Sequence, residues 1–560
     1  MLNGSEILME LLLEQGVDTV FGYPGGAVLH IYDALYQYSD RIRHVMTAHE
    51  QGAAHAADGY ARLTGKTGVV LATSGPGATN LVTGIATAYM DSVPLIAITG
   101  NVGTGFIGRD SFQEVYIAGI TMPITKHNFV VRHAEELAPT LRAAFNIAQE
   151  GRKGPVLVDI PKDVSAALCD YAPIALPSHA PDHTITGDID TALRLLNTAE
   201  RPLIYFGGGV TSANAGGLLR KLCEKADIPA THTLMAAGVL GCGEAHNLGL
   251  IGMHGCVTAN HAVHHCDLLV ILGARCSDRV ALNPASFAPQ AKKLHIDIDA
   301  AEFQKNIAVD CTLAGDVGVI LSTLLPQVAQ AQRGTWMEQI QAWRRKDYHP
   351  MDDASSLKPH QVMERISALA GKDAIYVTDV GQHQLWAAQY CRHVRPRSFL
   401  TSGGLGTMGF GYGASIGAAF GAQNTPNRPI VHITGDGSFH MNLQEACTAV
   451  SYAVPIITVI MNNHVLGMVR QWQSAFYAKR YSSTDPQRRT DFVQLAKGFG
   501  LPAFRCTDLR GFEGAFAQAL TITQSTKQPG PVWIECEIGK DEKVLPMIPA
   551  GGSLQDMMMD

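Results

Sequence analysis

Apolar runs alternate with segments of helical spacing along this 560-residue chain. Residues 430–434 and 456–461 are short, β-branched runs bounded by glycine or polar residues, which is typical of strands buried on both faces. Residues 442–452, between them, have the spacing of a helix. The same rhythm recurs throughout the chain, so we expect an α/β fold with three domains, each a doubly wound parallel sheet.

Two stretches with little periodicity divide the chain. The first, at about residues 166–187, contains three prolines, and the second, at about 346–358, mixes a proline with charged and polar residues. Both are typical of linkers between domains. The predicted divisions are a first domain at 1–165, a Rossmann-like middle domain at 188–345, a third domain at 359–540 and a C-terminal tail at 541–560.

Composition narrows the class of protein. The chain is 46% hydrophobic and 17% charged, and its 56 glycines suit a large α/β enzyme with many tight turns. A net charge of −7 without a basic block argues against nucleic acid and anionic membranes as partners. No apolar run reaches membrane-spanning length.

Cysteine usage and the N-terminus indicate a compartment. The 11 cysteines are scattered and form no CxxC pair, so we expect reduced thiols in a cytoplasm. The first residues predict an amphipathic helix carrying Glu6, Glu10 and Glu14. Because a basic segment and a small-residue cleavage site are absent there, we do not expect a signal peptide.

Polar residues follow both of the strands described first. The tetrapeptide Gly-Asp-Gly-Ser at 435–438 follows one strand, and Asn463 closes an Asn-Asn pair after the next. In a βαβ unit the two strand ends lie side by side, so Asp436 and Asn463 should face one crevice. Their hard oxygen ligands suit Mg²⁺ that also holds a phosphorylated cofactor. An ordinary turn with a helix-capping aspartate would explain the tetrapeptide alone, but not its pairing with Asn463.

The first domain has its own candidate carboxylate. Glu50 stands where a short strand passes into an alanine-rich helix, and Ala48, Ala53 and Ala54 would keep water away from it. An acidic residue at a helix N-terminus is also common for dipole reasons alone. Glycine-rich or polar motifs accompany it along the chain: YPGG, AHEQGAA, TSGPGATN and SFQE.

These motifs, the GDG and NN pair, and the segment LGMVRQWQ resemble, in order and spacing, the catalytic large subunits of acetolactate (acetohydroxyacid) synthases, a branch of the thiamine-diphosphate-dependent enzymes. The resemblance extends from YPGG to the tail VLPMIPAGG. It implies that the first domain binds the pyrimidine ring of thiamine diphosphate and the third binds its diphosphate with Mg²⁺. The implied metal ligands are Asp436, Asn463 and Val465. The residues implied to contact the cofactor are Pro24, Thr73, Pro76, Asn80, Val380, Gly381, Gln382, His383, Gly406, Met408, Gly435, Asp436, Gly437, Ser438, Asn463, Leu466, Gly467 and Met468.

The middle domain carries a second set of motifs: GGG, TLMAAG, GMHG, GAR with a following DR, HIDID and GDV. A glycine triplet alone is weak evidence for a nucleotide, since such turns close most βα units. In this order, however, the motifs resemble the FAD-carrying domain of biosynthetic acetolactate synthases, where the flavin is structural. The implied FAD contacts are Arg152, Gly207, Gly208, Gly209, Thr233, Leu234, Gly252, Met253, His254, Gly273, Arg275, Arg279, Asp297, Ile298, Asp316 and Val317.

The resemblance also implies a reaction: decarboxylation of pyruvate on thiamine diphosphate, then condensation of the two-carbon unit with pyruvate or 2-ketobutyrate. The products, 2-acetolactate or 2-aceto-2-hydroxybutyrate, belong to branched-chain amino acid biosynthesis. Glu50 would relay a proton through the aminopyrimidine, Met408 would support the bent cofactor, Arg279 would hold the acceptor carboxylate, and Trp472 would wall the acceptor's alkyl group. The residues implied at the reaction centre are Glu50, Phe112, Gln113, Lys162, Met253, His254, Arg279 and Trp472.

Partners and alternatives follow from the same resemblance. Active sites between the chains of a homodimer or homotetramer are expected, and a small regulatory subunit is possible in this family. A sibling carboligase or a pyruvate oxidase remains an alternative, although glyoxylate carboligase lacks a carboxylate at the position of Glu50. A catalytically silent, cofactor-binding subunit is a third hypothesis, which requires the loss of Glu50, Asp436 or Asn463. All three are present.

Three local departures from the family pattern are visible. The loop after GAR reads CSDRVALNPASF where the family usually has FDDRVTG, and Arg109-Asp110-Ser111 stands where Thr-Asp-Ala is usual. The tail reads IPAGG where two prolines commonly precede the glycine. The first departure affects the expected FAD and substrate-entrance geometry, although Arg279 itself is retained.

Overall fold

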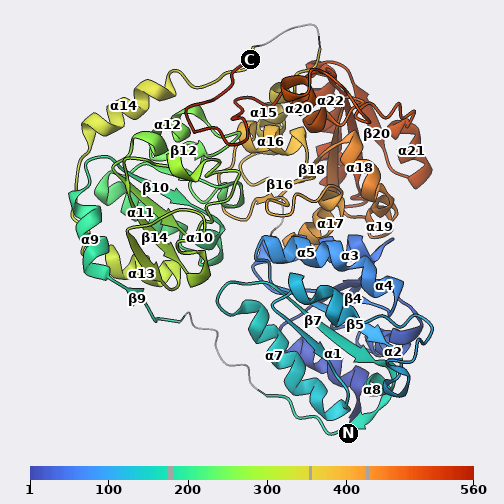
Figure 1. Cartoon of the computed structure of the whole chain (residues 1–560). Coiled ribbons are helices and arrows are strands. Elements are labelled where there is room, and N and C mark those ends of the chain that lie inside the picture. The colour runs from blue at the N-terminus through green and yellow to red at the C-terminus, as the bar shows by residue number, and fades with distance from the viewer. Residues whose placement is uncertain (175–181, 352–355, 424, 426–427) are drawn as a thin grey trace.

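The computed structural model describes residues 1–174, 182–351, 356–423, 425 and 428–560. Parts of both expected linkers, residues 175–181 with Pro177 and Pro181 and residues 352–355, lie outside the described residues. The chain forms three α/β bodies: the third, in orange and red, stands on the first, in blue, and the middle one lies to the side (Figure 1). Among the described residues, no helix combines the length and apolar character needed to cross a bilayer.

The first body contains a six-stranded sheet in the order β3-β2-β4-β5-β7-β6, with every neighbouring pair parallel. Every residue of β4, β5 and β7 is buried, because helices cover both faces of the sheet. The strands are β2 (Thr19–Gly22), β3 (Arg43–Met46), β4 (Gly68–Ala72), β5 (Leu95–Asn101), β6 (His127–Val130) and β7 (Pro155–Pro161). The main helices are α1 (Gly4–Glu14), α2 (Leu29–Gln37), α3 (Glu50–Thr64), α4 (Pro76–Asn80), α5 (Val82–Met90), α7 (Leu137–Gln149) and α8 (Lys162–Ala166).

The middle body has seven strands in the order β12-β11-β10-β13-β14-β15-β9. Six strands pair in parallel, as the predicted doubly wound parallel sheet requires, and a two-residue edge strand, β9 (Thr186–Gly187), pairs antiparallel with β15, so this sheet is mixed. An edge strand has one neighbour only, so an antiparallel strand can be added there without a crossover. The other strands are β10 (Pro202–Phe206), β11 (Ala230–His232), β12 (Asn247–Leu250), β13 (Leu268–Leu272), β14 (Lys292–Asp297) and β15 (Cys311–Ala314). The helices are α9 (Ile189–Thr198), α10 (Gly208–Ser212), α11 (Gly216–Ala226), α12 (Val257–His265), α13 (Val317–Leu324) and α14 (Gly334–Arg344).

The third body is a parallel sheet in the order β17-β16-β18-β19-β21-β20. Counted along the chain, its strands have the same order as those of the first body, with the first strand between the second and the third. The strands are β16 (Ile375–Thr378), β17 (Phe399–Leu400), β18 (Ile430–Gly435), β19 (Ile456–Asn462), β20 (Ala503–Cys506) and β21 (Val532–Glu537). The main helices are α15 (Pro359–Ala370), α16 (Gln382–Tyr390), α17 (Phe410–Ala422), α20 (Gly467–Phe476), α21 (Phe492–Phe499) and α22 (Leu509–Thr523).

The helix expected at 442–452 is confirmed in part: a short 3₁₀ turn and α19 (Ala446–Ser451) occupy this range, but another helix, α18 (Asp436–Asn442), precedes them. The break lies at Asn442, which leaves the helical conformation with φ −138° and whose side-chain amide donates to the carbonyl of Gly409 at 2.7 Å. Asp436 therefore lies in the first turn of a helix, directly after the strand.

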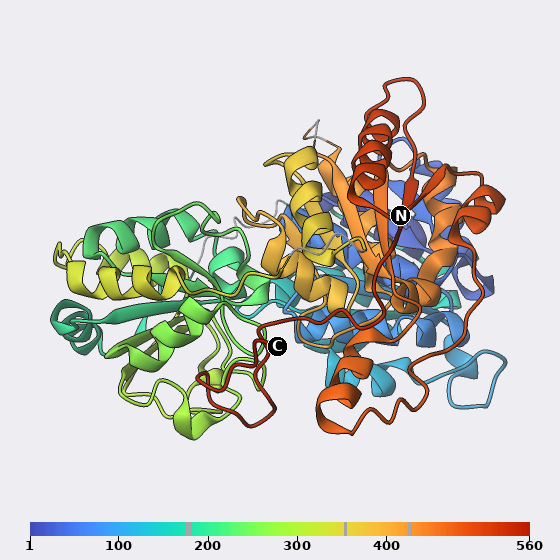
Figure 2. The same cartoon turned by 90° about the horizontal axis from the view of Figure 1, so that it is seen from above.

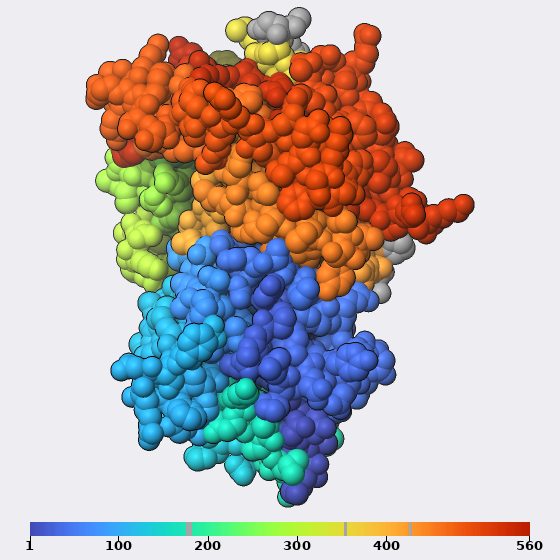
Figure 3. Space-filling view, turned by 90° about the vertical axis from the view of Figure 1, so that its right-hand side faces the viewer, coloured from blue at the N-terminus to red at the C-terminus, as the bar shows by residue number. Residues whose placement is uncertain are grey.

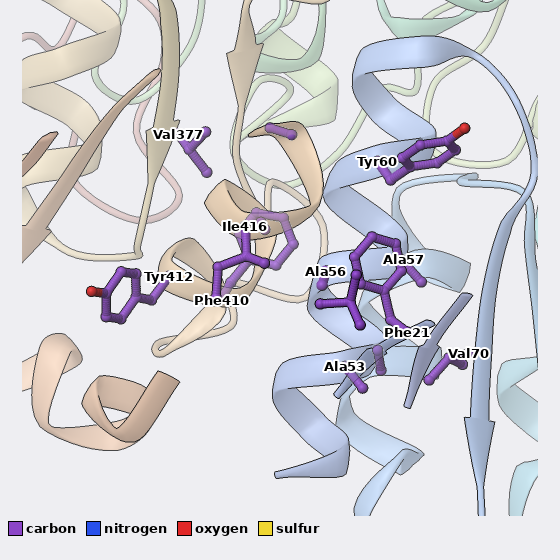
Figure 4. Packing of buried hydrophobic residues seen from close by; sticks show 14 of the residues in the cluster. Phe21, Ala53, Ala56, Ala57, Tyr60, Val70, Val377, Phe410, Tyr412 and Ile416 are labelled. Atoms are coloured by element: carbon purple, nitrogen blue, oxygen red, sulfur yellow. The ribbon is translucent and has the colours of Figure 1, made fainter. Parts of the chain in front are cut away.

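Helices α3 and α17 join the first body to the third (Figure 4). Their backbones touch because glycine stands at the contact points. A Cβ on Gly417 would lie 1.7 Å from the carbonyl oxygen of Ala56, and one on Gly59 would lie 2.2 Å from that of Ala414. Phe410 stands against this seam, at 5.3 Å from the ring of His55. This packing fixes the position of the α3 N-terminus, where Glu50 lies.

The C-terminal tail crosses from the third body to the middle one (Figure 2, dark red). Met547 and Leu545 pack with Met253 of the middle body, and Ile548 and Leu554 enter its core. The tail therefore contacts two bodies whose sheets are separate.

Candidate active site

The carboxyl ends of β18 and β19 form the first part of the site. The two strands are parallel neighbours in which Gly435 is opposite Met461, which confirms that Asp436 and Asn463 follow adjacent strand ends. Burial raises the pKa of the Asp436 carboxyl to about 6, although His464 and nearby backbone N–H groups partly offset this. A divalent cation would stabilise the buried carboxylate, so the site fits a metal with oxygen ligands.

His383 lies at the same edge of the sheet, in the first turn of α16. Its Nε2 atom is buried and has no hydrogen-bond partner among the residues that the structure describes, and burial lowers the pKa of the ring to about 4. A Cβ on either Gly381 or Gly435 would lie 2.8 Å from this imidazole, so both glycines are needed for the close approach. An unpartnered ring nitrogen beside the switch point between β16 and β18 fits a phosphate oxygen acceptor.

A cavity of about 3060 Å³ opens between the bodies, on the side of the middle sheet. Gly207 and Gly273, which follow β10 and β13, line it at the switch point of a sheet whose six parallel strands have the order of dinucleotide-binding folds. Gly209 and Gly273 touch there, since a Cβ on Gly209 would lie 2.7 Å from the Cα of Gly273. The hydroxyls of Thr211 and Thr233 face this cavity without a hydrogen-bond partner. The donor set fits a dinucleotide such as FAD.

Nearly all of the predicted FAD contacts line this cavity. Arg152 reaches across from the first body and pairs with Glu302 at 2.8 Å and Asp299 at 3.2 Å. Burial raises the pKa of nearby Asp297 to about 6. Gly252 does not line the cavity: its φ of +104° and its contact with the carbonyl of Arg279 give it a backbone role instead. The predicted residues that do line it are Arg152, Gly207, Gly208, Gly209, Thr233, Leu234, Met253, His254, Gly273, Arg275, Arg279, Asp297, Ile298, Asp316 and Val317.

The same cavity brings together the predicted acceptor residues. Met253, His254, Arg279 and Trp472 all line it, beside Val380, Gly381, Gly406 and Met468 of the diphosphate side. An Nη atom of Arg279 lies 3.7 Å from the Met253 sulfur. Its pairing with Asp278 is loose, at 3.8 Å between side chains that are 65% and 82% exposed. Such a pair contributes little, so the guanidinium is available to an anion.

The predicted residues of the first body gather separately. Glu50 is the first residue of α3, is 9% exposed, and accepts a hydrogen bond from the Asn80 side chain at 3.0 Å. Thr73 lies at the end of β4, against Gly25 and Gly77. Gln113 packs on Gly75 with a φ of +59°.

The structure does not bring all predicted residues into one cavity. Within the described ranges, none of Glu50, Phe112, Gln113 and Lys162 lines the large cavity, and the Phe112 side chain is 87% exposed. The predicted metal ligands Asp436, Asn463 and Val465 do not line it either; the cavity reaches their side of the sheet only through neighbours such as Gly381, which lies against His383. On the face shown in Figure 3 the blue first body lies directly against the orange third body. Glu50 and Asp436 belong to these two different bodies, and neither of them lines the large cavity.

Several supporting residues have no sequence motif that could have identified them. Glu445 of the third body accepts hydrogen bonds from the backbone N–H groups of Ala48 and His49, both at 3.1 Å, and so holds the turn before Glu50. Asp91 likewise accepts from Gly404 at 2.7 Å, which fixes the loop that carries Gly406. Both contacts join residues more than 300 positions apart, so only the fold shows them.

Three protein-family models match the chain. They are described as the N-terminal TPP binding domain, the central domain and the C-terminal TPP binding domain of thiamine pyrophosphate enzymes, and they cover residues 2–120, 189–324 and 379–536. The chain is also similar over its whole length to curated proteins. It is 45% identical to the acetolactate synthase large subunit of Parasynechococcus marenigrum, covering 100% of this chain and 91% of that one.

Two other relatives agree. The acetolactate synthase of Mycobacterium bovis is 45% identical, over 99% of this chain and 90% of its own. The acetolactate synthase large subunit of Corynebacterium glutamicum is 44% identical, also over 99% and 90%. Identity of this extent, together with the three matched domains, shows that the chain belongs to the acetolactate synthase family of thiamine pyrophosphate enzymes.

Proposed function

We propose that this chain condenses a two-carbon unit from pyruvate with a second 2-keto acid, giving 2-acetolactate or 2-aceto-2-hydroxybutyrate. The observation that carries the proposal is the position of the Asp436 and Asn463 strand ends next to the cavity that holds Arg279 and Trp472. Thiamine diphosphate, when bound, supplies the electron sink for decarboxylation and carbon–carbon bond formation. The protein's residues bind and orient the cofactor and the substrates, and they exclude water from the site.

Asp436, Asn463 and the carbonyl of Val465 would hold Mg²⁺, and His383 would donate to the diphosphate. Val465 fits this role because its backbone N–H already donates to the Asn463 side-chain oxygen at 3.1 Å, which fixes the turn. The buried Asp436 carboxylate supplies the negative charge that a cation requires. FAD would occupy the cavity beside the middle sheet, in a structural role.

Glu50 would hold and return a proton at the pyrimidine ring nitrogen. Its carboxyl is almost fully buried at a helix N-terminus and keeps one oxygen, Oε1, that is not bonded to Asn80. A buried, singly anchored carboxyl suits proton relay, because the free oxygen can face the ring while Asn80 fixes the orientation.

Arg279 and Trp472 would select the acceptor. A 2-keto acid brings a carboxylate into a largely apolar pocket, and a loosely paired guanidinium is its natural partner. The indole of Trp472 lies beside Phe476, with ring centroids 5.3 Å apart, and would contact an ethyl group more extensively than a methyl group. We expect 2-ketobutyrate to be preferred over pyruvate as acceptor.

The separation of the two residue groups supports active sites shared between chains. Glu50 and Asp436 belong to different bodies and neither lines the large cavity, so a second copy of the chain would bring the Glu50 half of one chain to the Asp436 half of another. A homodimer or a homotetramer built from such dimers satisfies this. Exposed apolar side chains surround the first-body half, Tyr23, Phe106, Phe112, Tyr116 and Met122, as a subunit interface requires.

An omission assay tests the function. The purified chain is incubated with pyruvate, thiamine diphosphate, Mg²⁺ and FAD, and acetolactate is measured as each component is left out. We expect product only with pyruvate, thiamine diphosphate and Mg²⁺ present. Oxygen uptake during turnover would instead indicate a pyruvate oxidase, and no product under any condition would contradict the proposal.

A further inference from the structure

A buried chain of side-chain amides connects the C-terminal tail to Asn463. Gln471, on α20, bonds both backbone groups of one tail residue: its Oε1 accepts from the Val544 N–H at 2.9 Å, and its Nε2 donates to the Val544 carbonyl at 3.0 Å. A backbone N–H can only donate and a carbonyl can only accept. The backbone of Val544 therefore decides which end of the Gln471 amide is the oxygen.

That orientation passes to the next residue. The Oε1 of Gln471 also faces Gln382, which must therefore present its amide N–H group: the Nε2 of Gln382 donates to this oxygen at 3.0 Å. The Nε2 of Gln382 also donates to the carbonyl of Glu542, in the tail, at 2.7 Å. The oxygen of Gln382 is thereby left for Asn463, whose Nδ2 donates to it at 3.3 Å. The oxygen of Asn463 is consequently turned the other way, toward Val465 and the proposed metal position.

Burial and packing fix this relay in place. Gln382, Gln471 and Asn463 are 4%, 7% and 7% exposed, and Val544 is fully buried, so water does not compete for their hydrogen bonds. Gly467 packs against the relay from the start of α20. A Cβ there would lie 2.0 Å from the Gln382 oxygen and 2.7 Å from the Asn463 nitrogen.

We propose that Gln471 is a positioning residue that orients the Asn463 oxygen toward Mg²⁺ and couples metal binding to docking of the tail at residues 542–547. The inference rests on the proposed function, because it needs Asn463 to be a metal ligand. Coupling is reciprocal: if a docked tail strengthens Mg²⁺ binding, bound Mg²⁺ strengthens docking of the tail by the same free energy. Partners that orient a ligand from behind typically change metal affinity about 10- to 100-fold.

The test compares the wild-type protein with Gln471→Leu, which keeps the size and removes every amide hydrogen bond. Mg²⁺ affinity is measured by calorimetry with saturating thiamine diphosphate, and protection of the amides of residues 542–547 by hydrogen exchange, with and without cofactor and metal. In the wild type we expect the cofactor and Mg²⁺ to increase tail protection. In Gln471→Leu we expect about 10- to 100-fold weaker Mg²⁺ binding and no such increase.

Two further variants separate orientation from loosening of the tail. Gln389→Leu removes one other bond to the tail, from its Nε2 to the Leu545 carbonyl at 3.1 Å, and one to the carbonyl of His254 in the middle body at 3.0 Å, without touching the relay. It should reduce tail protection but change Mg²⁺ affinity much less than Gln471→Leu. Gln471→Glu keeps both acceptor bonds, from Val544 and Gln382, and loses the donor to the Val544 carbonyl, so its Mg²⁺ affinity should lie between those of the wild type and Gln471→Leu. It also provides a test if the leucine variant does not fold.

The outcomes are distinct. Equal Mg²⁺ affinity in the wild type and Gln471→Leu, or an equal loss in Gln389→Leu, would overturn the positioning role. Absence of cofactor and Mg²⁺ binding by the wild type would instead count against the proposed function.

Discussion

The first and third bodies have the same strand order, but different side chains gather at the ends of their strands. In both sheets the first strand lies between the second and the third, so each has a switch point where polar side chains can gather. In the third body Asp436, Asn463 and His383 gather at these strand ends, and Gly381, which lies against His383, lines the large cavity. In the first body Glu50 and Thr73 gather there, and exposed side chains such as Tyr23 and Phe112 belong to the same body.

The difference shows how one topology supplies two kinds of chemistry. The third body offers a buried carboxylate and an unpartnered imidazole, which suit a cation and phosphate oxygens. The first offers a single anchored carboxyl among apolar residues, which suits an organic ring and a proton.

The largest effect is expected from Glu50→Gln. The amide keeps the size and the contact with Asn80, but it cannot exchange the proton, so turnover should fall by about 10²- to 10⁴-fold. Affinity for thiamine diphosphate should change less. Steady-state assay of acetolactate together with a cofactor titration checks both, and near-normal turnover would remove Glu50 from the mechanism.

Asp436→Ala should act on the other half. Removal of the buried carboxylate deletes a metal ligand, so the apparent affinities for Mg²⁺ and thiamine diphosphate should fall together, by at least about 100-fold. Saturating both components should then recover part of the activity. The matched variant Asp278→Ala removes an exposed carboxylate at the cavity and should leave both affinities in place. Unchanged affinities in Asp436→Ala would mean that the crevice is assigned wrongly.

The choice between pyruvate and 2-ketobutyrate as acceptor sharpens the comparison, because we expect it to depend only on residues that line the large cavity. One methylene in an apolar pocket is worth about 1–3 kcal/mol, or roughly 10- to 200-fold in selectivity. We expect Trp472→Leu to erase most of the preference for 2-ketobutyrate while coupling of two pyruvates continues, and Arg279→Ala to depress the use of both acceptors. A competition assay at known substrate ratios gives the product ratio. If Trp472→Leu kept the wild-type ratio of the two products, the indole would serve packing and would not select the acceptor.

The smallest effect concerns the seam between the two bodies. In Gly417→Ala the added Cβ would lie 1.7 Å from the carbonyl oxygen of Ala56, so the helices must move apart. Overpacking of this kind costs about 1–3 kcal/mol of folding stability. The midpoint of thermal unfolding should fall. Gly514→Ala is the control. Gly514 lies within α22, and an added Cβ there would have no other atom within 4 Å apart from the helix's own backbone, so the midpoint should not fall. An unchanged midpoint in Gly417→Ala would mean that the seam adapts without strain.

Much of this arrangement could be predicted from the sequence. The apolar runs that became β18 and β19 predicted their parallel pairing and hence the adjacency of Asp436 and Asn463. The helix α18 was not predicted, and the break between it and α19 at Asn442 depends on a bond to Gly409 from another element. The antiparallel β9 was missed since a two-residue edge strand leaves no periodic pattern.

The supporting contacts could not be predicted for a related reason. Glu445, Gln382 and Gln471 act on residues that are distant in the sequence, and their own surroundings have no distinctive spacing. The separation of Glu50 from the cavity is likewise a property of how the bodies dock, which no single motif encodes.

Mixing two inactive variants tests most directly that the halves come from different chains. Glu50→Gln and Asp436→Ala chains are combined under conditions in which exchange of subunits is demonstrated, and acetolactate formation is measured. If the site lies between chains, each hybrid dimer has one intact site, and activity should recover to roughly a quarter of the wild-type value at equal mixing. No recovery despite proven exchange would contradict a shared site and would require Glu50 and Asp436 to act within one chain.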